Sequence, residues 1–173
     1  GRLDQLANRR AITYFFESIW PDLAGRVKPL EIDVVGKNPP TWLVELSQRD
    51  PRVHVPGFVD DVRPYFQKAT VFVCPITDGG GTRLKILDAL AMGMPIVSTT
   101  FAASGLGLCD EKHLLLADTA SDFSSKTSRL LLDKAQRVHL ATGGREIVVS
   151  AYSWEVIGRR LREAYLIAMK TGK

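Results

Sequence analysis

A chain of 173 residues with 45% hydrophobic content can bury one sizeable core, so we expect a single compact domain over residues 1–173. The net charge of +4 is compatible with an anionic ligand, but the basic residues are scattered, which argues against a nucleic-acid partner. No apolar stretch approaches the roughly 20 residues that a membrane-spanning helix needs, and the first residues lack the pattern of a signal peptide.

The cysteines and histidines do not suggest a metal site. Cys74 lies in an apolar run and Cys109 in a loop, without metal-ligand spacing, so we expect reduced core thiols in a cytoplasmic protein. His54, His113 and His139 are far apart in the sequence, and we expect structural or surface roles for them.

Short apolar runs alternate along the chain with segments of helical period. Several of these runs are apolar throughout, as expected of parallel strands that helices cover on both faces. Strands are predicted at residues 30–35, 53–55, 71–76, 95–99 and 113–117.

The helical segments begin with residues 8–20, where Asn8 is the expected N-cap and Pro21 the expected stop. Gly143 and Gly144 should weaken the helix that contains them. Further helices are predicted at residues 41–48, 61–69 with Pro64 in the first turn, 83–92, 121–134, 135–151 and 153–170. The alternation predicts a doubly wound, Rossmann-like α/β domain with a parallel sheet, which binds ligands beyond the carboxyl ends of its strands.

The loop after the strand at residues 71–76 carries three successive glycines, Gly79–Gly81. Glycine adopts backbone angles that other residues avoid and lets the main chain approach a ligand closely. Thr82 is the expected N-cap of the following helix, which Gly93 and Pro95 end.

Two cations, Arg83 and Lys85, stand in the first turn of that helix, where each opposes the helix dipole by roughly 0.3–1 kcal/mol. A surface pair between Lys85 and Asp88 would recover only about 0.2–0.5 kcal/mol. An anion bound by the loop amides, the helix N-terminus and both cations makes the same charges favourable, because each of them then attracts the anion. We therefore expect a phosphate-type ligand, with the solvated surface pair as the alternative.

Neither a P-loop nor a G-x-G-x-x-G dinucleotide motif is present. The stretch "GGGTRLKILDALAMGMPIVST" instead resembles the donor-binding signature of the group 1 retaining GT-B glycosyltransferases, a glycine-rich loop followed by E-A-x-A-x-G-x-P-[VI]-V. Four other segments are similar to that family in the same order: "NRRAITYFFESIWP", "LEIDVVGKNPP", "RVHVPGFVDDVRPYFQKATVFVCP" and "AYSWEVIGRRL".

The resemblance covers only the C-terminal half of a GT-B fold, the domain that binds the nucleotide-diphosphate sugar. It implies that the acceptor is bound mainly by an N-terminal domain outside this chain, and that the domain's central first strand is absent, leaving unpaired sheet edges. Residues 150–173 would form a closing helix that packs toward the other domain or pairs with a second copy of this chain. We expect a cytoplasmic protein, and a peripheral position at the inner membrane face of the full enzyme is left open.

The family's residue roles map onto this sequence one at a time. Arg83 and Lys85 would face the diphosphate as the catalytic cations. Asp88 would hydrogen-bond the ribose, and the stretch Gly57-Phe58-Val59 would border the nucleobase. Main chain around Gly79, Gly80, Gly81 and Thr82 would contact sugar and phosphates, and Arg2 and Arg9 are the candidates for the basic pair of the opening loop.

One position departs from the family pattern. The acid that commonly lies eight residues before the position of Asp88 is Gly80 here, and Asp78 either substitutes for it or is a solvated turn residue. The implied chemistry needs no metal and no cofactor beyond the donor, because fixed cations and helix amides stabilise the departing diphosphate. The alternatives are a nucleotide-sugar-modifying enzyme of the non-hydrolysing epimerase type and a degenerate domain that only binds nucleotide.

Overall fold

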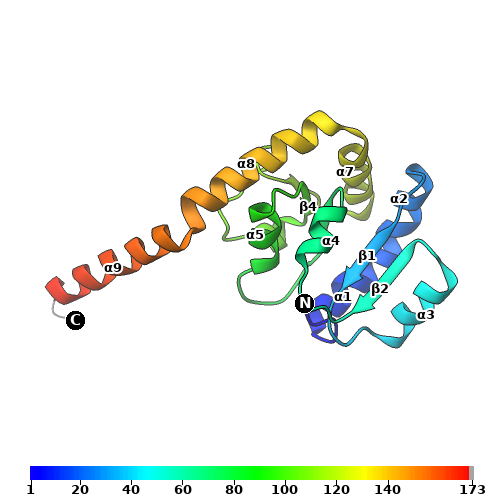
Figure 1. The fold of residues 1–173 in the computed structure, drawn as a ribbon, viewed down its shortest axis with the longest axis horizontal. Helices are drawn as coiled ribbons and strands as arrows, with labels where there is room; N and C mark the ends of the chain where they lie inside the picture. Colours follow the sequence, from blue (N-terminus) through cyan, green and yellow to red (C-terminus); the bar gives the residue numbers. More distant parts are fainter. Residues whose placement is uncertain (172–173) are drawn as a thin grey trace.

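Short parallel strands covered by helices make up the computed structural model, which describes residues 1–171 (Figure 1). Each strand that the sequence predicts is present, although most are shorter than expected, and every pairing is parallel. The predicted α/β class is therefore confirmed. The strands are β1 (Ile32–Val35), β2 (Val53–Gly57), β3 (Phe72–Cys74), β4 (Ile96–Ser98) and β5 (Leu115–Leu116).

The strands form two sheets, one of β1 and β2 and the other in the order β3-β4-β5. Within residues 1–171, β1 pairs only with β2, and β3 pairs only with β4, so each has one edge without a strand neighbour.

The N-terminal helix differs from its prediction at both ends. It begins at Leu6 with Gln5 at the N-cap, so Asn8 lies inside the helix. It also passes Pro21, because a π-type turn places this proline in a new first turn, where its missing N–H is not needed. The buried side chains of Phe15, Phe16 and Trp20 pack together at this turn. The segments are α1 (Leu6–Tyr14), η1 (Phe15–Ile19) and α2 (Trp20–Arg26).

The remaining helices of the domain lie close to their predicted positions. Pro64 is in the first turn of its helix, as expected. They are α3 (Thr41–Arg49), α4 (Arg63–Lys68), α5 (Leu84–Ala91), the short α6 (Thr100–Ala103) and α7 (Ala120–Leu132).

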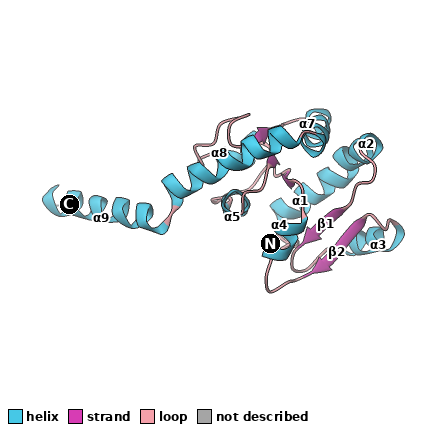
Figure 2. Cartoon of the chain, turned by 45° about the horizontal axis from the view of Figure 1, so that its top comes forward, coloured by secondary structure: helices cyan, strands magenta, loops and turns pink. Residues whose placement is uncertain are grey.

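The last two helices, α8 (Lys134–Tyr152) and α9 (Trp154–Thr171), form an arm that leads away from the strands (Figures 1 and 2). Gly143 and Gly144 do not interrupt α8. A β-carbon at Gly143 would collide with the carbonyl oxygen of Lys112, and one at Gly144 would lie 2.5 Å from a methyl carbon of Leu90. These glycines therefore allow α8 to pack closely on the domain.

The expected closing helix is present as α9, and residues 172–173 of its predicted segment lie outside the described residues. Its apolar side chains are exposed, with Trp154 87% and Tyr165 63% accessible. None of the helices described in residues 1–171 is long and apolar enough to cross a bilayer.

The two cysteines differ in environment. Cys74 is a buried free thiol, as expected, whereas Cys109 is exposed, so the prediction of a core position for Cys109 is wrong. His113 is buried, and its Nδ1 accepts a hydrogen bond of 2.9 Å from the Cys109 amide. Among residues 1–171, no cluster of three His, Cys, Asp or Glu side chains is arranged to hold a metal ion.

Candidate functional site

The glycine-rich loop joins the carboxyl end of β3 to the start of α5. Gly79 and Gly81 have φ angles of 94° and 83°, which L-residues with side chains rarely adopt. A β-carbon at Gly79 would lie only 2.8 Å from the β-carbon of Ala7. Glycine is therefore needed here both for the turn and for close packing of the loop against α1.

Arg83 is folded back over this loop. It occupies the N-cap position of α5, so the prediction of Thr82 as the N-cap is wrong. Its guanidinium lies 5.6 Å from the ring centre of Phe101. It donates hydrogen bonds of 2.5–3.1 Å to the carbonyl oxygens of Asp78, Gly79, Gly80 and Gly81. These hydrogen bonds fix the shape of the loop.

Lys85 is half-buried and points toward α1. Its Nζ donates a hydrogen bond of 2.8 Å to Oδ1 of Asn8, and Nδ2 of Asn8 donates one of 2.6 Å to the main-chain oxygen of Arg2. Burial lowers the pKa of Lys85, and the positive charge of Arg83 adds to the shift. The ion pairs found among residues 1–171 do not include Lys85 with Asp88. The surface-pair alternative is therefore not what this structure shows.

Asp78 forms an ion pair with Arg10 of α1. Its second oxygen, Oδ1, is buried without a hydrogen-bond partner. This carboxylate is neither a freely solvated turn residue nor an isolated acid next to the glycines. Sequence reasoning missed both Arg10 and Asn8, because their partners lie 68 and 77 residues away and no local pattern connects them.

The side chains of the two candidates for the basic pair differ in their surroundings. The Arg2 side chain pairs with Asp4 at 2.8 Å, and this guanidinium, helped by Asn38, holds the pKa of the Asp4 carboxyl well below its usual range. Arg9 is exposed and borders a hollow of about 660 Å³ at the carboxyl end of β1. The other residues that line this hollow are Asp4, Asn38, Pro39, Pro40, Thr41, Trp42 and Glu45.

The remaining predicted residues also stand at or near the carboxyl ends of strands. Gly57 ends β2 with a φ of 78°, and its carbonyl oxygen accepts a hydrogen bond of 2.9 Å from the Gly36 amide. Phe58 is 67% exposed beside it, followed by Val59, and Asp88 is exposed one turn into α5. A series of hydrogen bonds connects this end of β2 with Lys85. It leads from Gly57 to Gly36, then through residues 1–3 to Asn8.

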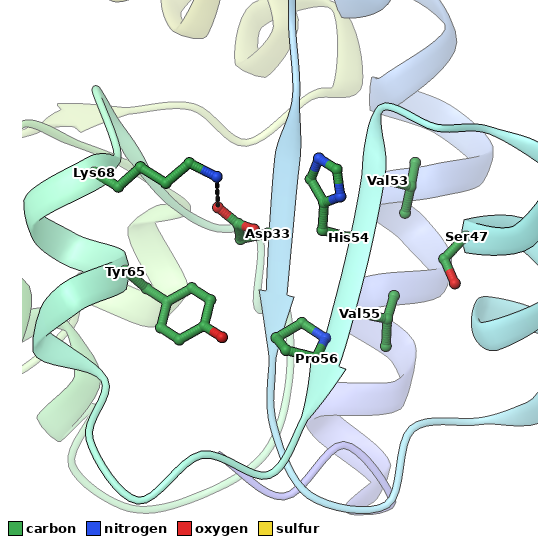
Figure 3. A pocket seen from close by; sticks show the side chains of 8 residues that line it. All are labelled: Asp33, Ser47, Val53, His54, Val55, Pro56, Tyr65 and Lys68. Carbon is green, nitrogen blue, oxygen red and sulfur yellow. Dashed lines mark ion pairs between the residues drawn. The ribbon is translucent and has the colours of Figure 1, made fainter.

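A second hollow, of about 480 Å³, lies on the β1–β2 side of the domain and contains none of the predicted site residues. Figure 3 shows Asp33 of β1 directed at Lys68 of α4, with 4.0 Å between carboxylate and ammonium, and Tyr65 beside them. The other lining residues are Ser47, Val53, His54, Val55 and Pro56.

Comparison with known proteins identifies the family. Residues 1–133 match the family model described as glycosyl transferases group 1. A lipopolysaccharide core biosynthesis glycosyltransferase, LpsE of Rhizobium meliloti (strain 1021), is 31% identical over 117 residues, which are 66% of this chain and 33% of LpsE. The chain thus spans about a third of this relative's length.

Solved structures share the fold at low sequence identity. The C-terminal domain of LpcC, a glycosyl transferase group 1 family protein of Francisella tularensis, has a TM-score of 0.70 at 19% identity, over 84% of this chain and 82% of that one. Anabaena HepE in complex with UDP has a TM-score of 0.78 at 16% identity, and the match covers 95% of this chain and 46% of HepE. Sucrose-phosphate synthase of Thermosynechococcus elongatus has a TM-score of 0.76 at 21% identity, and the match covers 99% of this chain and 44% of that one. The architecture is that of the C-terminal half of a GT-B fold, and the chain belongs to the glycosyl transferases group 1 family.

Proposed function

We propose that this domain binds the nucleotide-diphosphate sugar from which a retaining, metal-independent glycosyltransferase transfers the sugar to an acceptor. The diphosphate lies at the glycine loop, against Lys85 and Arg83. The ribose is held by Asp88 and the nucleobase lies beside the stretch Gly57-Phe58-Val59. The UDP complex of HepE supports a nucleotide donor for this fold.

The observation that carries the proposal is the environment of Lys85. A half-buried ammonium is costly unless an anion or several acceptors compensate for its lost hydration. Here its hydrogen-bond partner is the neutral amide oxygen of Asn8, and the nearby cation Arg83 further disfavours the charged ammonium. A diphosphate between these cations and the N-terminus of α5 supplies the missing negative charge.

The same arrangement suits the chemistry of sugar transfer. When the bond between the anomeric carbon and the diphosphate breaks, negative charge grows on the departing oxygen. Cations that are already positioned stabilise this charge without reorganising at the moment of reaction. Arg83 is fixed by the carbonyl oxygens of residues 78–81 and Lys85 by Asn8, so both are oriented before the donor arrives.

A thermal-shift panel tests this function. Nucleoside diphosphates and their sugars should raise the unfolding temperature, because a ligand of the folded state adds RT ln(1 + [L]/Kd) to stability. The matching nucleosides, which lack the diphosphate, should have little effect. A panel in which no nucleoside diphosphate at millimolar concentration shifts the transition would contradict the proposal.

A second candidate is a domain that binds nucleotide without taking part in transfer. Gly80 replaces the family's usual acid, and Asp78 is engaged by Arg10, which weakens the direct contact to the donor sugar. This candidate predicts equal affinity for a nucleoside diphosphate and for its sugar. The catalytic proposal predicts a measurable difference between them.

A further inference from the structure

The hollow of about 660 Å³ opens between the start of α1 and the start of α3, at the carboxyl end of β1. Its volume falls within the range of about 300–1,000 Å³ that is usual for ligand pockets. Adjacent residues of α1 serve this hollow and the glycine loop, because Asn8 bonds to Lys85 whereas Arg9 lines the hollow. The hollow is therefore separate from the place proposed for the diphosphate.

Trp42 supplies aromatic surface to this hollow. It is 38% exposed, and its ring meets the ring of Phe16 edge-on, with 6.0 Å between the centroids and 75° between the planes. Phe16 is buried in the core, so it anchors the indole in one orientation. Pro39 and Pro40 add apolar surface beside the indole. An exposed aromatic ring in a fixed position is a surface on which a flat, partly apolar ligand can stack.

Charged side chains of both signs accompany this ring. Arg9 is exposed at the start of α1, and Glu45 is exposed three residues after Trp42, on the same face of α3. The ion pairs found among residues 1–171 include neither of these two side chains. A strong donor and a strong acceptor are thus available to a ligand in the hollow.

The other polar groups of the hollow are fixed by their neighbours. Asp4 pairs with Arg2 at 2.8 Å and accepts a hydrogen bond of 3.0 Å from Nδ2 of Asn38. A carboxylate offers about four acceptor positions, so Asp4 can accept further hydrogen bonds. At the start of α3, the N-cap residue Pro40 gives no side-chain cap, so the first amides of this helix are not capped. The hollow therefore combines positioned donors and acceptors with an aromatic ring.

This combination fits a neutral sugar better than other classes of ligand. A phosphate or another anion would meet two carboxylates, Asp4 and Glu45, against the single guanidinium of Arg9. A purely apolar ligand would take hydration from these charged groups and give no hydrogen bond in return. The hydroxyls of a sugar both donate and accept hydrogen bonds. The C–H groups on one face of its ring pack well on an aromatic ring, whose face carries partial negative charge.

We propose that the hollow lined by Arg9, Trp42 and Glu45, the Trp42 site, binds a neutral sugar unit. The sugar stacks on Trp42 and exchanges hydrogen bonds with Arg9 and Glu45. Because Asn8 and Arg9 are adjacent in α1, a glycan in the Trp42 site lies beside the proposed donor position. Binding of the sugar does not depend on the proposed function, whereas a role in holding part of the acceptor rests on it.

The test follows the indole N–H signals of the protein by NMR during titration with sugars. The chain has three tryptophans, of which Trp20 is buried and Trp154 is 87% exposed, so the signals report on different places. The probes are the methyl glycosides of glucose, galactose and mannose, together with lactose and maltose. At least one of them should shift the Trp42 signal in a saturable way at millimolar concentration and leave the other two signals unchanged. Glycerol, which has hydroxyls but no ring face, should shift none of them.

Variants assign the binding to this hollow. Trp42→Ala should abolish saturation transfer from protein to sugar, and Trp42→Phe should retain part of it. Because Trp42 also packs on the core, two exposed residues provide a second set of variants. Arg9→Ala and Glu45→Ala should each weaken sugar affinity by about two- to tenfold, as expected for one lost hydrogen bond. The matched control is Arg49→Ala in the last turn of α3, which is exposed and does not line the hollow, and it should bind sugar as the native chain does.

UDP and inorganic phosphate distinguish the Trp42 site from the glycine loop. Sugar binding should persist with either of them present at millimolar concentration, and it should be found even if the chain binds no nucleotide. Displacement of the sugar by UDP would place the sugar in the donor site, and a saturable Trp42 shift with phosphate alone would make the hollow an anion site. Either result would overturn the proposal. So would the absence of a Trp42 shift with every sugar, or equal sugar affinity in Arg9→Ala, Glu45→Ala and Arg49→Ala.

Discussion

Lys85 and Arg83 differ in the contacts that hold them beside the glycine loop. Arg83 binds four carbonyl oxygens of the loop, so it contributes to the shape of the site even without a ligand. Lys85 has a neutral partner and is half-buried, so its charge is a cost to the unliganded chain. Replacing the two residues should therefore have different consequences.

Lys85→Met should weaken nucleoside diphosphate binding by roughly 2–5 kcal/mol, as for other charge-assisted contacts, and leave the unliganded chain equally or more stable. Arg83→Met should weaken binding and also lower stability, because the loop carbonyls lose their donor. Calorimetric titration and melting curves measure both effects, with the exposed Lys134→Met as control. Unchanged affinity and reduced stability in Lys85→Met would show that Lys85 is a structural residue.

The lowered pKa of Lys85 predicts proton uptake on binding. A bound diphosphate favours the charged ammonium and raises this pKa, so the complex holds more protons than its free components at alkaline pH, and affinity falls as pH rises. Titrations at about pH 9, far above the second phosphate pKa of about 6, isolate this effect. Buffers of different ionisation enthalpy should give different apparent heats for the native chain. The same uptake in Lys85→Met would assign the proton to another group.

Asp88 gives a test of the ribose contact. Asp88→Asn should weaken nucleotide binding because a charged acceptor is lost, and Asp88→Glu, which restores the family's usual length, should retain or improve it. The comparison ligand is a 2′,3′-dideoxynucleoside diphosphate, which lacks the hydroxyls. Equal affinity of the native chain for both nucleotides would remove the proposed role of Asp88.

At the scale of elements, α8 depends on the absence of side chains at its contact with the domain. Gly143→Ala should lower the free energy of unfolding by about 1–3 kcal/mol, because the new methyl group meets the main-chain oxygen of Lys112. The matched control is Gly158→Ala in α9, where nothing lies within 4 Å of the added carbon. This change should favour the helix by roughly 0.5–1 kcal/mol. Urea unfolding that ranks the two variants the other way would contradict the packing argument.

The elements also show how far sequence patterns reach. The strands and most helices were predictable, because apolar runs bounded by turn residues fix them locally. The passage of the first helix through Pro21 was not, since the π-type turn depends on the packing of Phe15, Phe16 and Trp20. The position of the glycine loop and its cations followed from local sequence. The partners of those cations on α1 did not, because they come from a distant part of the chain.

At the scale of the whole molecule, we expect the 173-residue chain to bind donor nucleotide and not to transfer sugar. The proposed nucleotide contacts all come from loops and from the start of α5 in this domain, whereas transfer also requires an acceptor held against the anomeric carbon. That positioning is worth about 7–11 kcal/mol of the barrier. The measurement compares nucleotide affinity and sugar transfer between this chain and a longer protein that carries the family's N-terminal domain. Sugar transfer by the 173-residue chain at a rate above spontaneous donor hydrolysis would refute the expectation that transfer needs the second domain.

The glycine contacts of α8 also have a mechanical consequence. Gly144 rests on Leu90 of α5, the helix that starts at the glycine loop, and Arg160 bonds to the Ala151 oxygen across the joint between α8 and α9. From Gly144 to the end of α9 the arm extends over about 40 Å at 1.5 Å per residue. A tilt of α5 by about 5°, carried through such a lever, displaces the far end by about 3 Å. The position of a spin label or fluorophore at Met169 would then report donor-induced movements of α5 that are too small to measure at the loop itself.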